Sequence, residues 1–161
     1  MSDGVSVRSA RPEDWPAVAA LLAELGRPDV LGTPDEEPAR HLFLSWLEGD
    51  DTEALVGELD GRVVGFVDMQ YQRWLNYTRP KAWVPDLVVS ETARSHGVGA
   101  ALLARAEELA RERGSFAIQL ESANWRTRAH AFYLREGWTD AAKAFVKVFD
   151  RSVRPPGTPP E

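Results

Sequence analysis

Two glycines separated by one residue stand where a strand pattern gives way to a helix pattern. The apolar run of Leu87, Val88 and Val89 has the length and branched composition of a buried strand, and a helical pattern opens at Gly97. Glycines at such a place let backbone N–H groups approach a ligand without an intervening Cβ, and a helix N-terminus favours negative charge. The connection therefore predicts a phosphate site, formed by Arg94, Ser95, His96, Gly97, Val98, Gly99 and Ala100.

Two familiar phosphate loops do not match this connection. No Lys followed by Ser or Thr comes after the glycines, so the ammonium group of a P-loop is missing. The dinucleotide fingerprint lacks its third glycine, and about seven residues separate the strand from Gly97. For the glycine pair alone a second interpretation stays open, namely a loop that only turns a strand into a helix.

The helix predicted after the glycines is amphipathic. Its apolar residues recur at steps of three and four, with charged residues mostly on the opposite face, and Gly114 suits its C-terminal end. The apolar residues are Leu102, Leu103, Ala106, Leu109 and Ala110.

The segment from the strand through this helix resembles motif A of the GNAT N-acetyltransferase superfamily. The signature of that motif is Arg or Gln, two residues, Gly, one residue, and Gly or Ala, which Arg94, Gly97 and Gly99 match. Further along, SANWRTRAHAFYLREGW resembles motif B of the same family, with Trp138 where Phe is usual. The resemblance spans roughly residues 5–149. It implies an α/β fold with a mixed, mostly antiparallel twisted sheet of six to seven strands and four helices, in which strands four and five are parallel and splayed.

Membership of that family implies acetyl-coenzyme A as the cosubstrate. The loop amides of the family hold the pyrophosphate, which implies this role for residues 94–100 here. The resemblance also implies that the strand of residues 87–89 pairs with pantetheine and that an amide of Val88 or Val89 donates to the tetrahedral oxyanion. Asn124 falls where some relatives contact coenzyme A, although its offset from Ala129 departs from the common N-x-x-A form.

Acetyl transfer to an amine requires the neutral amine. An alkylammonium has a pKa near that of lysine, ~10.4, so most acceptor molecules arrive protonated and some group must take the proton. The sequence contains no cysteine and no nucleophile-elbow serine. Direct attack of the amine in a ternary complex is therefore favoured over a covalent enzyme intermediate.

Three residues are candidates for proton transfer. The resemblance places Tyr133 near the thioester sulfur, where a phenol can protonate a thiolate whose conjugate acid has a pKa of roughly 8.5. Asp86, at the start of the fourth strand, and Glu121, at the end of the fifth, are candidate bases, directly or through water. Each has a structural alternative, because Tyr133 could simply pack beside Phe132 and the two carboxylates could be solvated at strand ends.

Two functional hypotheses follow from these residues. The first is an acetyl-CoA-dependent N-acetyltransferase that acts on a primary amine, either of a small molecule such as a polyamine or aminosugar or of a protein. The second is an acyl-CoA-binding regulatory module that has lost transfer activity. Tyr133 with Asp86 or Glu121 favours the enzyme.

Composition limits the class of protein. At 161 residues we expect one acetyltransferase domain over residues 1–150, followed by a Pro-rich, disordered tail over residues 151–161. The net charge of -6 argues against a nucleic-acid partner.

No signal-peptide pattern and no apolar run near the ~20 residues of a membrane span occur, so we expect a cytoplasmic protein and no membrane partner. His41, His96 and His130 lack metal-ligand spacing, so no metal is predicted. A homodimer is possible, as in many relatives.

The remaining elements follow in chain order. We expect strands over residues 5–10, 52–59, 62–71, 115–121 and 145–149, with Asp60 and Gly61 as a two-residue hairpin turn. A first helix carries the stripe from Trp15 to Leu25 and stops at Gly26. A second helix follows Thr33, and another carries the AHAFY residues of motif B.

Two segments have both a structural and a functional interpretation. Asp35, Glu36 and Glu37 suit a helix N-terminus capped by Thr33, or they attract a protonated amine, since this loop borders the acceptor site in the family. The aromatic stretch from Trp74 to Trp83 either packs in the sheet core or lines an acceptor groove.

Overall fold

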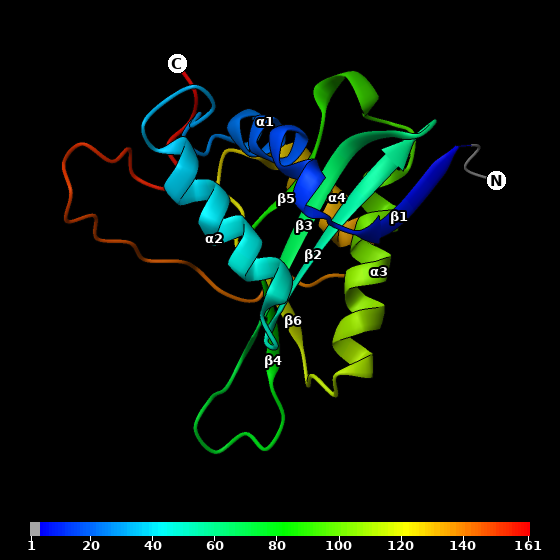
Figure 1. The fold of residues 1–161 in the computed structure, drawn as a ribbon. Helices are drawn as coiled ribbons and strands as arrows, with labels where there is room; N and C mark the ends of the chain where they lie inside the picture. The colour runs from blue at the N-terminus through cyan, green and yellow to red at the C-terminus, as the bar shows by residue number, and fades with distance from the viewer. Residues whose placement is uncertain (1–3) are drawn as a thin grey trace. The chain divides into compact units, whose positions relative to one another are not determined.

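The computed structural model describes residues 4–161. These residues form two compact units, one ending at Gln119 and one running from Leu120 to Glu161, which are described in turn. Within the first unit, Figure 1 shows the strands as one twisted sheet that carries helices on both of its faces.

The sheet has six strands in the order β1-β2-β3-β4-β6, and β5 also pairs with β3. Neighbouring strands are antiparallel except for β4 and β6, which run parallel. This confirms the predicted mixed sheet and its parallel pair. The strands are β1 (Val5–Ser9), β2 (Thr52–Leu59), β3 (Arg62–Gln72), β4 (Lys81–Val84), β5 (Leu87–Val89) and β6 (Ile118–Leu120).

The hairpin between β2 and β3 turns at Asp60 and Gly61, as predicted. Both residues have positive φ, 52° and 79°, which a two-residue hairpin of the common primed type requires. Register along the hairpin shifts between Gly57 and Glu58.

The fourth strand of the sequence prediction is interrupted. Its first part is β4, which pairs with β3 near Gln70 and, through the bond from the Ala82 N–H to the Ala117 oxygen (2.9 Å), with the β6 segment. Pro85 and Asp86 then interrupt the strand, and β5 continues along β3 opposite residues 65–67. Proline has no N–H for a sheet ladder, so the break falls at Pro85.

Two helices cover one face of the sheet in the first unit. They are α1 (Trp15–Leu25), which ends at Gly26 with φ 101°, and α2 (Glu36–Glu48), which begins three residues after Thr33. Alternation along β3 and β5 turns Phe66 and Val88 to this face. The buried core there comprises Trp15, Val18, Ala19, Leu21, Phe43, Ala54, Val56, Phe66 and Val88.

The helix α3 (Val98–Glu112) packs against β1, β2, β3 and β5. Its buried residues include Val98, Leu102, Leu103 and Ala106, as the predicted stripe requires. Gly114, with φ 78°, follows its end. Among the described residues no helix is both long and apolar enough to cross a bilayer.

The second unit contains one helix, α4 (Thr127–Arg135), within the predicted motif B segment. The prediction of a final strand over Phe145–Phe149 is wrong, because these residues are neither helical nor extended in a sheet. Phe145 and Phe149 are 93% and 90% exposed. An alternating pattern predicts a strand only where a partner strand completes its hydrogen bonds, and the described residues provide none for this segment. The single domain over residues 1–150 and the disordered tail stay predictions.

Candidate functional site

The connection from β5 to α3 is anchored at its beginning. The Ser90 N–H donates to the Val64 oxygen (2.7 Å), which extends the pairing with β3 by one residue. The Glu91 N–H donates to Glu24 Oε1 of α1 (3.1 Å), and Ala93 is buried. The short 3-10 turn of Glu91–Ala93 is thus held from both sides, which fixes where the following loop starts.

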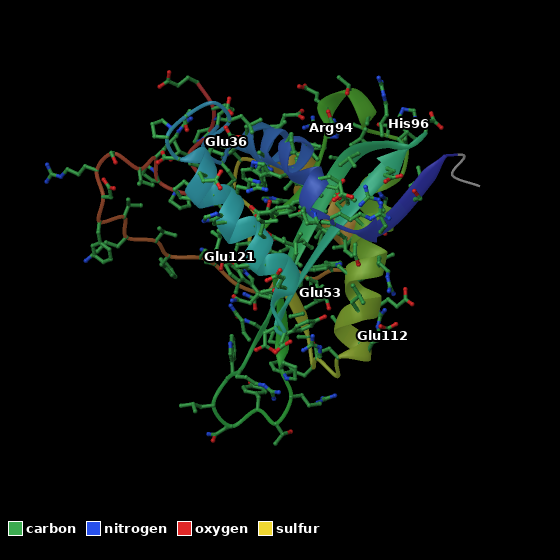
Figure 2. All side chains as sticks on the ribbon, viewed as in Figure 1. Glu36, Glu53, Arg94, His96, Glu112 and Glu121 are labelled. Atoms are coloured by element: carbon green, nitrogen blue, oxygen red, sulfur yellow. The ribbon has the colours of Figure 1, made fainter. Side chains whose placement is uncertain are left out.

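The second part of the connection, from Arg94 to Gly97, is exposed (Figure 2). Ser95 and Gly97 both have positive φ, 71° and 82°. A Cβ on Gly97 would meet no atom within 4 Å, so the backbone conformation and not space favours glycine there. Two left-handed residues separated by one residue bend the loop sharply before the start of α3.

The N–H groups at the start of α3 have no acceptor among the described residues. The first bond of the helix runs from the Ala101 N–H to the Gly97 oxygen (3.0 Å), which leaves Val98, Gly99 and Ala100 as orphan donors. A helix N-terminus also carries partial positive charge. Unbonded N–H groups at this end suit an anion such as phosphate, as the glycine spacing predicted.

Two glycines in the sheet allow α3 to approach closely. A Cβ on Gly57 of β2 would lie 2.6 Å from Val98 Cγ1, and one on Gly65 of β3 would lie 2.9 Å from both Val98 Cγ1 and Leu102 Cδ1. These contacts are shorter than side chains tolerate, so glycine is needed at both positions for this packing. The packing of Val98 against the sheet in turn fixes where α3 starts.

Successive backbone N–H groups of β5 point alternately toward β3 and away from it. The Asp68 N–H donates to the Asp86 oxygen (3.1 Å), and the Ser90 N–H donates to the Val64 oxygen. In an antiparallel ladder, hydrogen-bonded pairs alternate, so Val88, which lies between these two, also faces β3. The N–H groups of Leu87 and Val89 therefore point away from β3. This alternation favours Val89 over Val88 as a donor to a ligand.

Asp86, a predicted base, lies at the break before β5. Its Oδ1 accepts from Arg27 Nε (2.7 Å), and Arg27 Nη2 donates to the Pro85 oxygen (3.0 Å). The Asp86 side chain is only 13% exposed. The Asp86 N–H donates to Oδ1 of Asp68 on β3 (2.8 Å).

The sequence prediction missed Asp68 and Arg27. Burial, and then the charge of Asp86, raises the pKa of the Asp68 carboxyl well above its usual range. Asp68 sits in an apolar alternating strand, where an acid is unexpected, and that was the one available signal. Nothing in the sequence indicated that Arg27, from just after α1, would reach the same place.

The second unit holds the other predicted residues. Tyr133 lies on α4, with its ring centroid 5.4 Å from that of Phe132 and 5.9 Å from that of Trp138. Burial raises the pKa of Tyr133 above 10, and Arg126 opposes this shift. The phenol is thus neutral at physiological pH, as a proton donor must be. Glu121, labelled in Figure 2, and Asn124 are exposed.

Of the two segments with alternative interpretations, the acidic one is mostly exposed, whereas the aromatic one runs from exposed residues into the buried strand β4. Tyr77 and Trp74 are about half exposed, and Tyr77 stacks on Phe116 with centroids 4.5 Å apart. Lys81 Nζ lies 3.7 Å above the Trp74 ring. In the acidic segment, Glu36 Oε2 accepts from the Gly32 N–H (2.8 Å), so this acid closes the turn before α2.

Comparisons with known proteins identify the family of this chain. The model of the acetyltransferase (GNAT) family matches residues 15–138. The chain is 32% identical to an aminoalkylphosphonate N-acetyltransferase of Salmonella typhimurium, over 88% of this chain and 90% of that protein. It is 30% identical to a streptothricin acetyltransferase of Streptomyces lavendulae, over 84% of this chain and 64% of that protein.

A solved structure shares the fold. A putative acetyltransferase from Agrobacterium tumefaciens superposes with a TM-score of 0.78 at 23% identity, over 89% of this chain and 99% of that chain. The family model covers the connection before α3 as well as α4, so both predicted motifs lie within the match. The chain belongs to the GNAT family of acetyl-CoA-dependent N-acetyltransferases.

Proposed function

We propose that this enzyme transfers acetyl from acetyl-CoA to the primary amine of a small molecule, by direct attack in a ternary complex. The names of two relatives support a small-molecule acceptor, since one acts on aminoalkylphosphonates and the other on streptothricin. The absence of cysteine supports direct attack. The single observation that carries the proposal is the set of unbonded N–H groups at the start of α3.

Binding of the cosubstrate is assigned to the backbone around β5 and α3. The N–H groups from Ser95 to Ala100 donate to the diphosphate, and the positive end of α3 favours its charge. Arg94, exposed on the same loop, adds a guanidinium, while His96 contributes its amide. Asn124 stays a weaker candidate for a coenzyme A contact.

The free edge of β5 is assigned to the pantetheine arm and the reacting carbonyl. The N–H groups of Leu87 and Val89 point away from β3, and Val88, between them, pairs with β3 and holds the strand in register. A fixed donor aimed at a developing oxyanion stabilises the transition state more than the substrate, which is what raises turnover. We assign this donor to Val89.

Proton transfer is assigned to side chains. Tyr133 protonates the departing thiolate, and its raised pKa keeps the proton in place until then. Asp86 or Glu121 takes the proton of the incoming amine. Asp86 is the stronger candidate, because it adjoins the outward amides of β5.

The test is an acetyl-transfer assay with a panel of amines that includes aminoalkylphosphonates, polyamines, aminosugars and a lysine peptide, with release of free thiol as the readout. We expect acceptor-dependent thiol release with at least one small amine. Release only with the lysine peptide would overturn the small-molecule assignment. Binding of acetyl-CoA without release with any amine would overturn transfer itself.

A further inference from the structure

The carboxyl groups of Asp68 and Asp86 lie side by side at the break between β4 and β5. Both backbone polar groups of Asp86 bond to Asp68. The Asp86 N–H donates to Asp68 Oδ1 (2.8 Å), and the Asp86 backbone oxygen accepts from the Asp68 N–H (3.1 Å). The only bound cation of this pair is Arg27, whose Nε lies 2.7 Å from Asp86 Oδ1. Two adjacent acids thus share a single guanidinium, within the residues described.

We propose that Asp68 is a positioning residue that makes Asp86 an effective base, so that the two carboxyls act as one proton acceptor in acetyl transfer. This proposal rests on the proposed function of the same site. Asp86 would touch the amine, since it leads directly into the strand whose outward amides face the thioester. Asp68 would act through Asp86, by holding its backbone and by sharing its proton.

The electrostatics of the pair support this role. Burial and the charge of Asp86 both favour a proton on Asp68, and Arg27 opposes them. The other strand beside Asp68 contributes no charge, because Ala54 of β2 lies opposite it. Two carboxyls that cannot both ionise easily titrate as a pair, with one apparent pKa moved upward. A carboxylate alone is too weak a base for an ammonium near neutral pH, whereas a pair with a raised apparent pKa is a stronger one.

The proton balance of the step is complete. The ionised pair takes one proton from the ammonium, and the neutral nitrogen attacks the thioester carbon to form the C–N bond. The C–S bond breaks with its electrons on sulfur. The second proton leaves the nitrogen of the adduct and restores the phenol of Tyr133, whose own proton has gone to the departing sulfur. The pair then releases its proton to water, so one proton is produced per turnover.

The principal test compares the pH profiles of kcat for the wild-type enzyme and for Asp68→Asn. The asparagine keeps an oxygen for the Asp86 N–H and imitates a permanently protonated Asp68. We expect wild-type kcat to rise with pH through the apparent pKa of the pair. In Asp68→Asn this rise should be lost, with kcat at its alkaline plateau lower by roughly 10²-fold and the KM for acetyl-CoA unchanged. Superimposable profiles would overturn the proposal.

A second variant keeps the proposal testable if Asp68→Asn folds poorly. Arg27 is 48% exposed, so Arg27→Gln should fold, and loss of its charge should move the rise in kcat to higher pH. The matched control is Arg113→Gln, which removes a guanidinium that is 40% exposed and pairs with Asp51. An equal shift in both variants, or no shift in Arg27→Gln, would contradict the pair.

A stability measurement separates this proposal from the proposed function, because it needs no substrate. A carboxyl whose pKa is higher in the folded state than in the unfolded state stabilises the fold at low pH, and this contribution is lost as pH rises through the folded pKa. Asp68→Asn should therefore gain stability relative to wild type as pH rises above about 4, the pKa of an aspartate in the unfolded chain. If the difference in stability between Asp68→Asn and wild type does not change with pH, the carboxyls do not share a proton, even if the enzyme is active. If the difference changes with pH as expected but the wild type is inactive, only the proposed transfer reaction is wrong.

Discussion

The two ends of β5 present groups of opposite character. After Val89, the loop before α3 offers uncharged backbone N–H groups that are exposed and have no acceptor among the described residues. Before Leu87, Asp86 and its neighbour Asp68 on β3 present carboxyl groups that are largely enclosed and that each accept a hydrogen bond. The first arrangement can receive an anion without any protein bond being broken. The second can hold or release a proton, but its behaviour depends on each of its neighbours.

This difference sets what substitutions should do. A binding site made of backbone responds to changes in conformation, so its variants should alter affinity for acetyl-CoA. A proton-transfer site made of side chains responds to changes of charge, so its variants should alter turnover and its pH dependence. Substitutions in the two regions should therefore show whether binding and proton transfer separate in this way.

Tyr133→Phe should show the largest effect, on turnover alone. Loss of the phenolic proton should lower kcat by roughly 10²-fold, since general acid catalysis contributes about that much. The dissociation constant of acetyl-CoA, measured by calorimetry, should stay within about twofold of the wild-type value. Phe132→Leu, a change of the neighbouring ring, is the control for packing of α4. If Tyr133→Phe turns over at the wild-type rate, the acid assignment is wrong.

Gly65→Ala should disturb the C-terminal end of β5, because Gly65 pairs with Val89. Its Cβ would lie 2.9 Å from side chains of Val98 and Leu102 and 3.3 Å from the Val88 oxygen. Such overpacking should lower the free energy of unfolding by about 1–3 kcal/mol, measured by denaturant titration.

The companion Val98→Ala removes one of the clashing methyl groups. The double variant should then be more stable than the sum of the single changes predicts. Additive effects would show that α3 does not rest on Gly65 as described.

Gly97→Ala should weaken binding without changing turnover. Alanine disfavours φ 82° by about 1–2 kcal/mol, so the loop should relax and acetyl-CoA should bind roughly tenfold more weakly. At saturating acetyl-CoA, kcat should be restored. Gly114→Ala is a close control, since Gly114 has φ 78° and equally open surroundings at the other end of α3. Equal loss of affinity in both variants would show that only the stability of the helix matters.

Arg94→Ala should have the smallest effect. An exposed guanidinium contributes about 1 kcal/mol or less to an ionic contact, so the affinity for acetyl-CoA should fall only a few-fold. The difference from wild type should shrink as salt is raised, because exposed charges are screened. Arg111→Ala, near the other end of α3, should leave affinity unchanged. A loss that is large and independent of salt would mean that the side chain, and not the backbone, carries phosphate binding.

The loop was predictable from sequence because its determinants are contiguous. Gly97 and Gly99 lie on one short segment, and the periodicity of α3 and the turn at Asp60 and Gly61 are likewise local patterns. Backbone N–H groups also need no particular side chain. Local spacing therefore sufficed to predict the loop and the helix that follows it.

The acid pair was not predictable, because it is assembled from three separate segments. Asp68, Asp86 and Arg27 come together only through the pairing of β3 with β5 and the placement of α1. The prediction of a strand over Phe145–Phe149 failed for a related reason. Its alternation of apolar and polar residues is a local pattern, but a strand also requires a partner strand. Prediction from one sequence is thus strongest where all the residues that determine a feature lie within one short segment.

In our proposal, the backbone N–H groups at the start of α3 bind the diphosphate of acetyl-CoA. Backbone amide resonances measured by NMR during titration test it directly, with acetylpantetheine, which lacks the diphosphate, as the comparison ligand. We predict that the resonances of Gly97, Val98, Gly99 and Ala100 shift with acetyl-CoA and not with acetylpantetheine, while that of Gly114 stays in place. Saturable binding of acetyl-CoA that leaves these four resonances unmoved would contradict the account.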